Sequence, residues 1–375
     1  RLIFLGNRPR SRYHYQGKPP VTAWLSARGN FMDYPGEKLI LKLWETLAEK
    51  GIGSLLKPWH EKRVSRARNE IRREEILILA QAEKEAEFIK SGKAVYSTDD
   101  LKFIPRALND LNLGNVVVAK EAESVIELSP FSLRASEIEF SESVRKEVNV
   151  SKAVMVAEDI LAQDSQEPSD SSIDDDWLFN WRENAGRVSS EELRNLWGKI
   201  LAGELKQPGS YSVRTLEFLK SLSKSEAELI SKVARFVIAE RIYRNKEKLL
   251  EKQGIYFSQL LFLQDIGILS GVEGTGLSTT YKSKSEDKFF QPLLANNKII
   301  LIEHKDSGKE ALAEVYLLTK VGVEVLRLAS FTVDKEYLES VARDYVNKGF
   351  EVKVGDWVQE TAESGQYFNA RVVSA

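Results

Sequence analysis

The sequence predicts a mainly α-helical protein: an N-terminal helical hairpin, a helical bundle and a C-terminal winged-helix-like α+β module. Apolar residues recur at helical spacing in most patterned segments, and helix-capping Ser-x-x-Glu sequences precede two of them. Strand-like runs are few and short. With 375 residues, of which 42% are hydrophobic, the chain can form two or three domains with buried cores.

The composition excludes several classes of site. The chain has no cysteine, which excludes disulfides, thiolate metal sites and a thiol nucleophile, and fits a cytoplasmic location. Its three histidines, His14, His60 and His304, are scattered, so we expect no metal and no cofactor. The 54 basic and 56 acidic side chains argue against a globally basic nucleic-acid-binding protein but allow a local basic patch. No apolar run is long enough to predict a transmembrane segment.

Residues 1–31 mix arginine, proline, glycine and aromatic residues without a period. Met32 follows Arg28-Gly29, a dipeptide that a ribosome-binding sequence can encode. We therefore expect residues 1–31 to be a non-native leader that is read through in frame. The alternative is a native but disordered arm.

Residues 32–92 are predicted to form the helical hairpin. Its first helix lies within 36–57, where five apolar residues share one face: Leu39, Ile40, Leu43, Trp44 and Leu47. A charged second helix is expected over 61–90, with Val64, Ile71 and Ile78 as a narrow inner stripe of heptad spacing.

Residues 93–163 are expected to have mixed structure, with a strand at 116–118 and a helix over 135–162. The next segment, 164–176, contains six acidic residues and no basic one. Such a composition is typical of a solvated linker, so we place a domain boundary there.

Residues 177–240 are predicted to form the helical core. Ser189 with Glu192, and Ser223 with Glu226, have the spacing of capping boxes that begin two of its helices. The short loops between these helices predict a compact antiparallel bundle.

Residues 241–331 are predicted to form the winged-helix-like module. Helices near 242–253 and 256–266 precede a Gly/Ser/Thr-rich loop at 271–287. Strands at 298–304 and 312–318 are expected to pair as a hairpin through a turn at 306–308. A helix capped by Thr319 follows. The tail, 332–375, is expected to add a helix at 335–348 and strands at 350–354 and 367–373 that pack on the wing sheet.

A basic segment at 57–73 is a candidate site for phosphates of nucleic acid or anionic lipid. Its predicted contact residues are Lys57, Lys62, Arg63, Arg66, Arg68, Arg72 and Arg73. The alternative, which we favour, is a solvated helix with Glu/Arg pairs. Trp44 and Trp59 are candidate membrane or partner contacts, although docking of their helix on its own protein is again favoured.

The winged-helix-like module could bind DNA through helix 256–266, with Lys282 and Lys284 contacting phosphates. That helix carries only two amide side chains, Gln259 and Gln264, and no basic one. We therefore favour a winged helix that mediates protein contact or dimerisation.

Three short patterns have weaker interpretations. Asp174–Asp176 could bind a divalent cation, but adjacent acids in a linker are usually solvated. Glu204-x-Lys206 resembles part of a nuclease motif without its upstream aspartate. Residues 211–214, at a helix start, could bind a small anion, but capping by Ser212 is favoured.

The stretch VSSEELRNLWGKILAGELKQPGSYSVRTLEFL, which begins at Val188, resembles the core of a bacterial family of unknown function. The runs GEKLILKLWETLAEKGIGSLLKPW and RREEILILAQAE resemble the same family, so the likeness covers most of 32–330. The pattern from Leu193 to Ala202, then Leu219 to Ser223, then YLLTKVGVEVL, is more distantly similar to the Abi-alpha family of abortive phage infection. These are mostly packing residues, so the likeness implies a fold more than an activity.

We therefore expect no catalytic residue and a non-enzymatic cytoplasmic interaction protein, for which the Abi-alpha resemblance implies a role in phage defence. The expected partner is another protein or a second copy of the chain. Contact with nucleic acid or with a membrane surface stays open. The alternative functions are a winged-helix DNA-binding regulator, and an effector that acts at a membrane interface or through an enzymatic site formed only in the fold.

Overall fold

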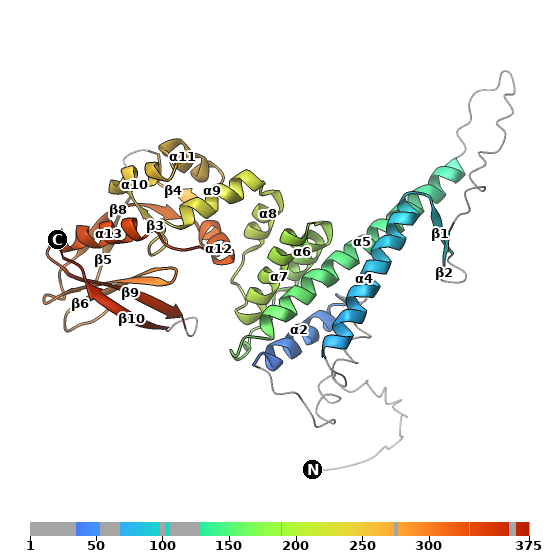
Figure 1. The fold of residues 1–375 in the computed structure, drawn as a ribbon, viewed down its shortest axis with the longest axis horizontal. Helices are drawn as coiled ribbons and strands as arrows, with labels where there is room; N and C mark the ends of the chain where they lie inside the picture. The colour runs from blue at the N-terminus through green and yellow to red at the C-terminus, as the bar shows by residue number, and fades with distance from the viewer. Residues whose placement is uncertain are drawn as a thin grey trace, which may run out of the picture. The chain divides into compact units, whose positions relative to one another are not determined.

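The computed structural model describes residues 35–52, 68–97, 102–105, 128–188, 190–273, 277–329, 331–359 and 365–374 (Figure 1). The chain divides into two compact units, 1–34 and 35–375, and every described residue belongs to the second. The expectations for the leader, for Trp59 and for a strand at 116–118 lie outside the described residues. The described part is 55% helical and 19% strand. The prediction of a mainly α protein is therefore wrong, and the fold is mixed α and β.

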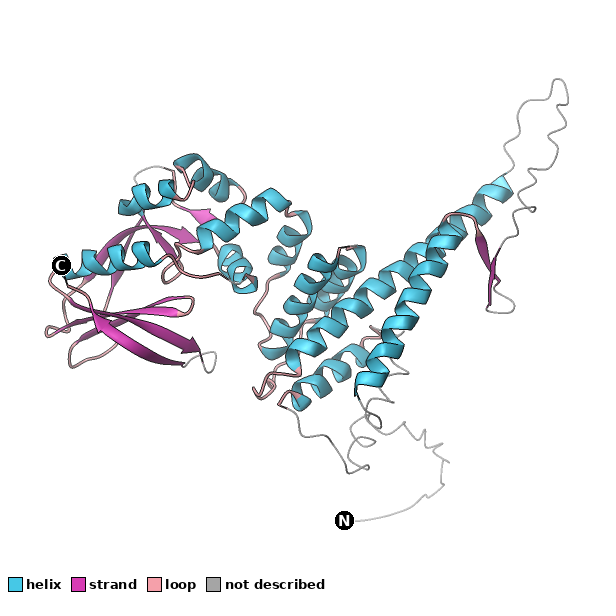
Figure 2. Ribbon diagram, in the orientation of Figure 1, coloured by secondary structure: helices cyan, strands magenta, loops and turns pink. Residues whose placement is uncertain are grey.

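Helices make up the described chain before residue 240, apart from one small hairpin (Figure 2). The helices are α2 (Glu37–Glu49), α4 (Arg68–Lys90), α5 (Leu128–Leu161), α6 (Asp175–Arg187), α7 (Glu191–Lys206), α8 (Val213–Ser221) and α9 (Lys224–Ala234). The hairpin pairs β1 (Ala94–Ser97) with β2 (Lys102–Pro105). α5 is the central element, because α2, α4, α6 and α7 all pack against it.

The predicted apolar face of α2 is confirmed. All five of its apolar residues are buried, and Trp44 is only 4% exposed. The helix packs on α5 and α7. Trp44 therefore docks α2 on its own protein, the alternative that the sequence favoured, and little of its side chain is exposed for contact with a membrane or partner.

The inner face of α4 differs from the predicted stripe. Ile78 is 38% exposed, whereas Leu79, Ala86 and Ile89 are buried together with Glu75. The error has a physical reason: a glutamate occupies one of the core positions, and the heptad of Val64, Ile71 and Ile78 follows apolar residues only. The side chains of Val64 and Ile71 lie outside the described part.

Side-chain caps begin several helices, because the first amides of a helix lack partners within it. Ser223 and Glu226 form the expected capping box of α9. At α7 the cap is Ser190, which accepts from the Leu193 amide, so the expected box on Ser189 is wrong by one residue. Thr319 caps its helix as predicted.

The acidic segment 164–176 runs close to basic side chains of two helices. Lys206 pairs with Asp164 at 2.9 Å, and Lys38 pairs with Glu167 at 2.6 Å. Lys50 pairs with Asp175 at 2.7 Å. These ion pairs hold the segment against α2 and α7, whereas its composition alone indicates a solvated linker.

The C-terminal half is built on two four-stranded antiparallel sheets. Its strands are β3 (Arg241–Tyr243), β4 (Leu269–Ser270), β5 (Leu277–Tyr281), β6 (Phe289–Ala295), β7 (Lys298–His304), β8 (Ala311–Leu318), β9 (Glu351–Gln359) and β10 (Gly365–Val372). Its helices are α10 (Glu247–Lys252), α11 (Phe257–Asp265), α12 (Lys320–Leu328) and α13 (Lys335–Asn347). In one sheet β8 pairs with β3, β4 and β5, and the other has the order β10-β9-β7-β6.

The two strands predicted to form a hairpin belong to different sheets. β7 pairs with β6 through a tight turn at Asn296, whose φ of 53° suits a hairpin, and β8 pairs elsewhere. Pro292 lies in β6 and argues against a strand in the sequence, yet it is tolerated because β6 is an edge strand. The tail strand β9 then pairs directly with β7, so the tail completes this sheet.

Candidate functional site

Most of the predicted basic site lies outside the described residues, namely Lys57, Lys62, Arg63 and Arg66. The backbone of Arg68 begins α4, but its side chain is not described. Arg73 is exposed on α4. The structure therefore places only Arg72 and Arg73 of this group well enough to examine.

Arg72 is used within the fold. Its guanidinium pairs with Asp159 and donates to the Met155 carbonyl at 3.2 Å. Glu75 and Glu158, both buried, lie 3.9 Å away. Four groups of the protein thus surround this side chain, and it holds α4 against α5 instead of presenting a free cation to a phosphate.

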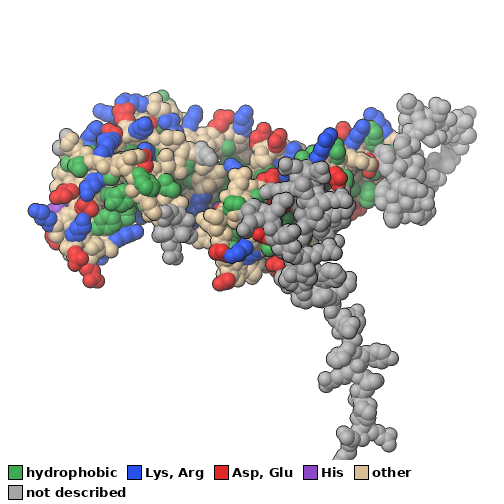
Figure 3. Space-filling view, turned by 60° about the horizontal axis from the view of Figure 1, so that its bottom comes forward, with side chains coloured by type: hydrophobic (Ala, Val, Ile, Leu, Met, Phe, Trp, Pro, Cys, Tyr) green, Lys and Arg blue, Asp and Glu red, His purple; other side chains and the backbone are tan. Residues whose placement is uncertain are grey.

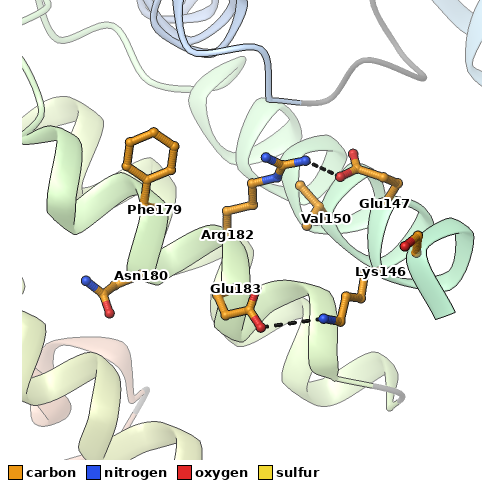
Figure 4. Close-up of a pocket in the computed structure, with 8 residues that line it drawn as sticks. Lys146, Glu147, Val150, Phe179, Asn180, Arg182 and Glu183 are labelled. Atoms are coloured by element: carbon orange, nitrogen blue, oxygen red, sulfur yellow. Dashed lines mark hydrogen bonds and ion pairs between the residues drawn. The ribbon is translucent and has the colours of Figure 1, made fainter. Parts of the chain in front are cut away.

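A groove of about 700 Å³ lies between α5 and α6 (Figure 4). Across it Arg182 pairs with Glu147, and Lys146 lies 3.6 Å from Glu183. Burial raises the pKa of Glu183, but the neighbouring Arg187 and Lys146 outweigh it and leave that pKa below its ordinary value. Cations and carboxylates neutralise one another here, so the groove has little net charge with which to attract an ionic ligand.

The groove was not predicted from the sequence. Its paired residues lie on different helices, more than thirty positions apart, and no local motif indicates such a pairing. Phe179 is 52% exposed at this groove, while Trp177 and Trp181 of the same helix are buried.

α11 presents the most distinctive surface. Leu260 and Leu263 are buried on its inner side. Tyr256 and Phe257 are each 54% exposed and Phe262 is 41% exposed. We call these three side chains the α11 aromatic face; Phe257 and Phe262 lie five positions apart, about 140° around the helix, so they flank its outward side. No lysine or arginine occurs between Tyr256 and Ile266.

The two amides expected to face DNA are engaged within the protein. The Gln259 side-chain oxygen accepts from the Tyr256 amide at 2.8 Å and completes the start of α11. The Gln264 side-chain oxygen accepts from the Val272 amide at 2.7 Å. Each amide oxygen is therefore bound to the chain's own backbone, which removes the acceptors that would contact base edges.

Lys282 and Lys284 follow β5 and are exposed. The neighbouring Lys288 pairs with Glu303 at 3.1 Å. On the face drawn in Figure 3, basic and acidic side chains are interspersed instead of forming a patch of one sign. The predicted phosphate contacts are thus accessible, and the exposed acidic residues Glu286 and Asp287 follow them in the chain.

Comparison with protein families shows which family this part of the chain matches. Residues 134–342 match the family described as a protein of unknown function (DUF2806). The chain belongs to the DUF2806 family. The match begins within α5 and ends within α13, so it contains the groove, the α11 aromatic face and strands of both sheets. No curated protein matches the chain, and no solved structure matches it.

The expected resemblance to a family of unknown function is confirmed for the DUF2806 region, whereas α2 and α4 precede it. Within that region the nuclease-like pattern is not assembled. Glu204 binds the amides of Gly209 and Tyr211, and Lys206 pairs with Asp164. The two residues therefore act in separate contacts.

Metal ligation finds no support among the described residues of this DUF2806 chain, which contain no cluster of three or more His, Cys, Asp or Glu suited to a metal ion. Asp174 caps α6 by accepting from the Trp177 amide at 2.9 Å, and Asp175 pairs with Lys50. In the same part of the chain, each helix is too short or too polar to cross a bilayer.

Proposed function

We propose that this protein acts by binding another protein through the α11 aromatic face. The observation that carries the proposal is the exposure of Tyr256, Phe257 and Phe262 on a helix whose inner residues are fully packed. Aromatic side chains of this kind supply most of the binding energy in many protein interfaces. Exposed aromatic side chains are costly to leave in water, and a partner that covers these three recovers that cost.

The chemistry of α11 favours protein over DNA as the partner. A helix that binds in the major groove offers basic or amide groups to bases and phosphates. The outward side of α11 instead offers Phe257, Phe262 and the exposed carboxylate of Asp265. A negative charge beside a phosphate backbone would weaken binding.

Photo-cross-linking in living cells tests this proposal. A benzoylphenylalanine placed at Phe257 is expected to yield a protein adduct, and its mass shows whether the partner is a second copy or a different protein. The same probe at Ser231, an exposed residue of α9, is the matched control. The double variant Phe257→Asp with Phe262→Asp should weaken binding of the recovered partner at least tenfold. Absence of an adduct, or an adduct with nucleic acid, would contradict the proposal.

Binding to DNA is the second candidate function, and the exposure of Lys282 and Lys284 is the observation that favours it. It predicts duplex binding that weakens with salt and is lost in the double variant Lys282→Glu with Lys284→Glu. Titration of labelled duplex DNA at two salt concentrations decides between the candidates. Unchanged binding in this variant would remove the second one.

The resemblance to the Abi-alpha family extends the proposal to phage defence, and the absence of cysteine supports placing that role in the cytoplasm. In this role the partner would be a phage or host protein recognised by the α11 aromatic face. A bacterial strain that expresses the chain should then form fewer phage plaques than one that expresses the double aspartate variant. Equal plaque numbers across a phage panel would contradict the defence role, while the binding proposal would still depend on the cross-linking result.

A further inference from the structure

The connection between α7 and α8, residues 207–212, is bound by two buried glutamates from different elements. Glu204, near the end of α7, is 2% exposed. Its two oxygens accept from the Gly209 amide at 2.5 Å and from the Tyr211 amide at 3.0 Å. Both oxygens of this carboxylate therefore have backbone partners in the connection.

The second glutamate comes from α12, more than a hundred residues later. Glu324 is also 2% exposed, and its Oε2 accepts from the Ser212 amide at 2.6 Å and from the Ser212 hydroxyl at 2.9 Å. Ser212 is the N-cap of α8, as predicted. The small anion envisaged for this helix start is thus a carboxylate of the protein itself, placed where the helix dipole favours negative charge.

The two carboxylates are incompletely neutralised. They accept from consecutive backbone amides, those of Tyr211 and Ser212, which brings two like charges to one short segment. Glu324 Oε1 accepts no hydrogen bond from the described residues, and the nearest cation, Lys320, is 3.8 Å away and 76% exposed. The pair of Glu324 with Lys320 therefore compensates the buried carboxylate poorly. Such a pair adds little stability and is weaker than an apolar contact of the same size.

The other elements packed on α12 add little charge. α12 packs chiefly on α7, α8, α9 and β8. On α8 the charged residues Arg214, Glu217 and Lys220 are all exposed, and on α7 Lys199 is exposed while Lys206 pairs with Asp164. On α9, Glu226 belongs to its own capping box, and the remaining charged side chains are exposed. The charged residue of β8, Glu314, is also exposed. Arg327 and Glu324 both act on the buried Tyr211, whose pKa burial raises to about 12.

We propose that Glu204 and Glu324 form a proton-sensitive joint between α7–α8 and α12, which tightens when Glu204 takes up a proton. The joint consists of these two side chains and the amides of Gly209, Tyr211 and Ser212. Protonation of Glu204 removes one of the two like charges and with it their repulsion. At neutral pH the joint is at its weakest, and there α12 and the elements that follow it in the chain separate from the helical core.

The direction of the pH effect follows from linkage. Burial raises the pKa of Glu204, its backbone amides lower it in part, and the charge of Glu324 raises it further, so that it stands above its ordinary value. The closed joint therefore binds the proton more tightly than the open one. Stability from this group is present at acidic pH and is lost as the pH rises through the raised pKa.

Hydrogen exchange of the full chain tests the joint without any variant. After correction for intrinsic exchange, protection of the amides of Gly209, Tyr211 and Ser212 should rise at least about threefold from about pH 7.5 to about pH 5, since a full unit of pKa displacement corresponds to tenfold in an equilibrium constant. Protection that stays constant, or falls, over this range overturns the proposal.

Variants show which group is responsible. Glu324→Gln can keep the Ser212 bonds through its carbonyl, so we expect it to fold with undiminished protection at neutral pH and a smaller rise on acidification. Glu204→Gln should show no rise, although its NH₂ group opposes one backbone amide and weakens the joint. Glu228→Gln, on the exposed side of α9, is the control and keeps the wild-type rise.

Lys320→Gln separates this proposal from an ordinary salt bridge. Because Lys320 is 76% exposed, its loss should leave protection nearly unchanged. A salt bridge that stabilises the interface would instead make Lys320→Gln and Glu324→Gln equally harmful at neutral pH. That pattern would overturn the proton-sensitive joint even if both variants fold.

Discussion

Gly198 shows how closely two helices approach at a single residue. It is buried in α7, and a Cβ atom added there would lie 2.6 Å from the Cβ of Val156 and 2.9 Å from the Ala153 carbonyl oxygen, both on α5. Neither atom can move away easily, since one belongs to the backbone and the other is a branched Cβ. The glycine therefore allows α7 to lie directly on α5.

We expect Gly198→Ala to lower the free energy of unfolding by about 1–3 kcal/mol, the usual cost of overpacking a core. This loss opposes the gain of about 1 kcal/mol that alanine gives over glycine in an unstrained helix. Urea unfolding followed by circular dichroism measures the difference. Asn195→Ala, on the exposed side of α7, is the control and should be neutral or slightly stabilising. A variant at Gly198 that gained stability would show that α5 and α7 can separate at little cost.

At the scale of elements, the sequence predicted helices well where caps and apolar spacing agree. The apolar face of α2 and the starts of α9 and α12 lie where they were expected, because a capping side chain or a regular apolar face marks each one. The end of α9 was placed near residue 240, whereas the helix ends at Ala234. The stripe of α4 was wrong because buried Glu75 is polar and the exposed Ile76–Ile78 are apolar. Periodicity of apolar residues cannot detect a core position that a charged residue fills, as Glu75 does beside Arg72.

The corrected face of α4 predicts unequal effects for neighbouring residues. Leu79→Ala removes a side chain that is 2% exposed and should cost about 2–5 kcal/mol of unfolding free energy. Ile78→Ala removes one that is 38% exposed and should cost much less. Chemical denaturation of both variants measures the contrast. If the losses were equal, or larger at Ile78, the heptad stripe would describe α4 better than the structure does.

At the scale of the whole molecule, strand pairing and the candidate site lay beyond local patterns. The sequence located both strands of the expected hairpin, but their partners are decided by contacts with β6, β5 and the distant β9. The groove between α5 and α6 depends on ion pairs between separate helices. On α11 the lack of basic residues was visible in the sequence, whereas the engagement of Gln259 and Gln264 by backbone amides became visible only in the fold.

Pairing of β9 with β7 makes the C-terminal tail part of the second sheet, and truncation tests this. Ile299, Ile300, Leu301 and Ile302 of β7 are each at most 2% exposed. A chain that ends at Lys348 loses β9 and β10, which turns β7 into an apolar edge strand with unpaired backbone groups. We expect this chain to aggregate or to lose the cooperative unfolding of its C-terminal half. A chain that ends at Gln359 loses only the segment containing β10, which is exposed along nearly all its length, and should stay soluble with a small loss of stability. Sedimentation velocity and thermal unfolding compare the two chains, and equal behaviour would mean that β9 is not needed to cover β7.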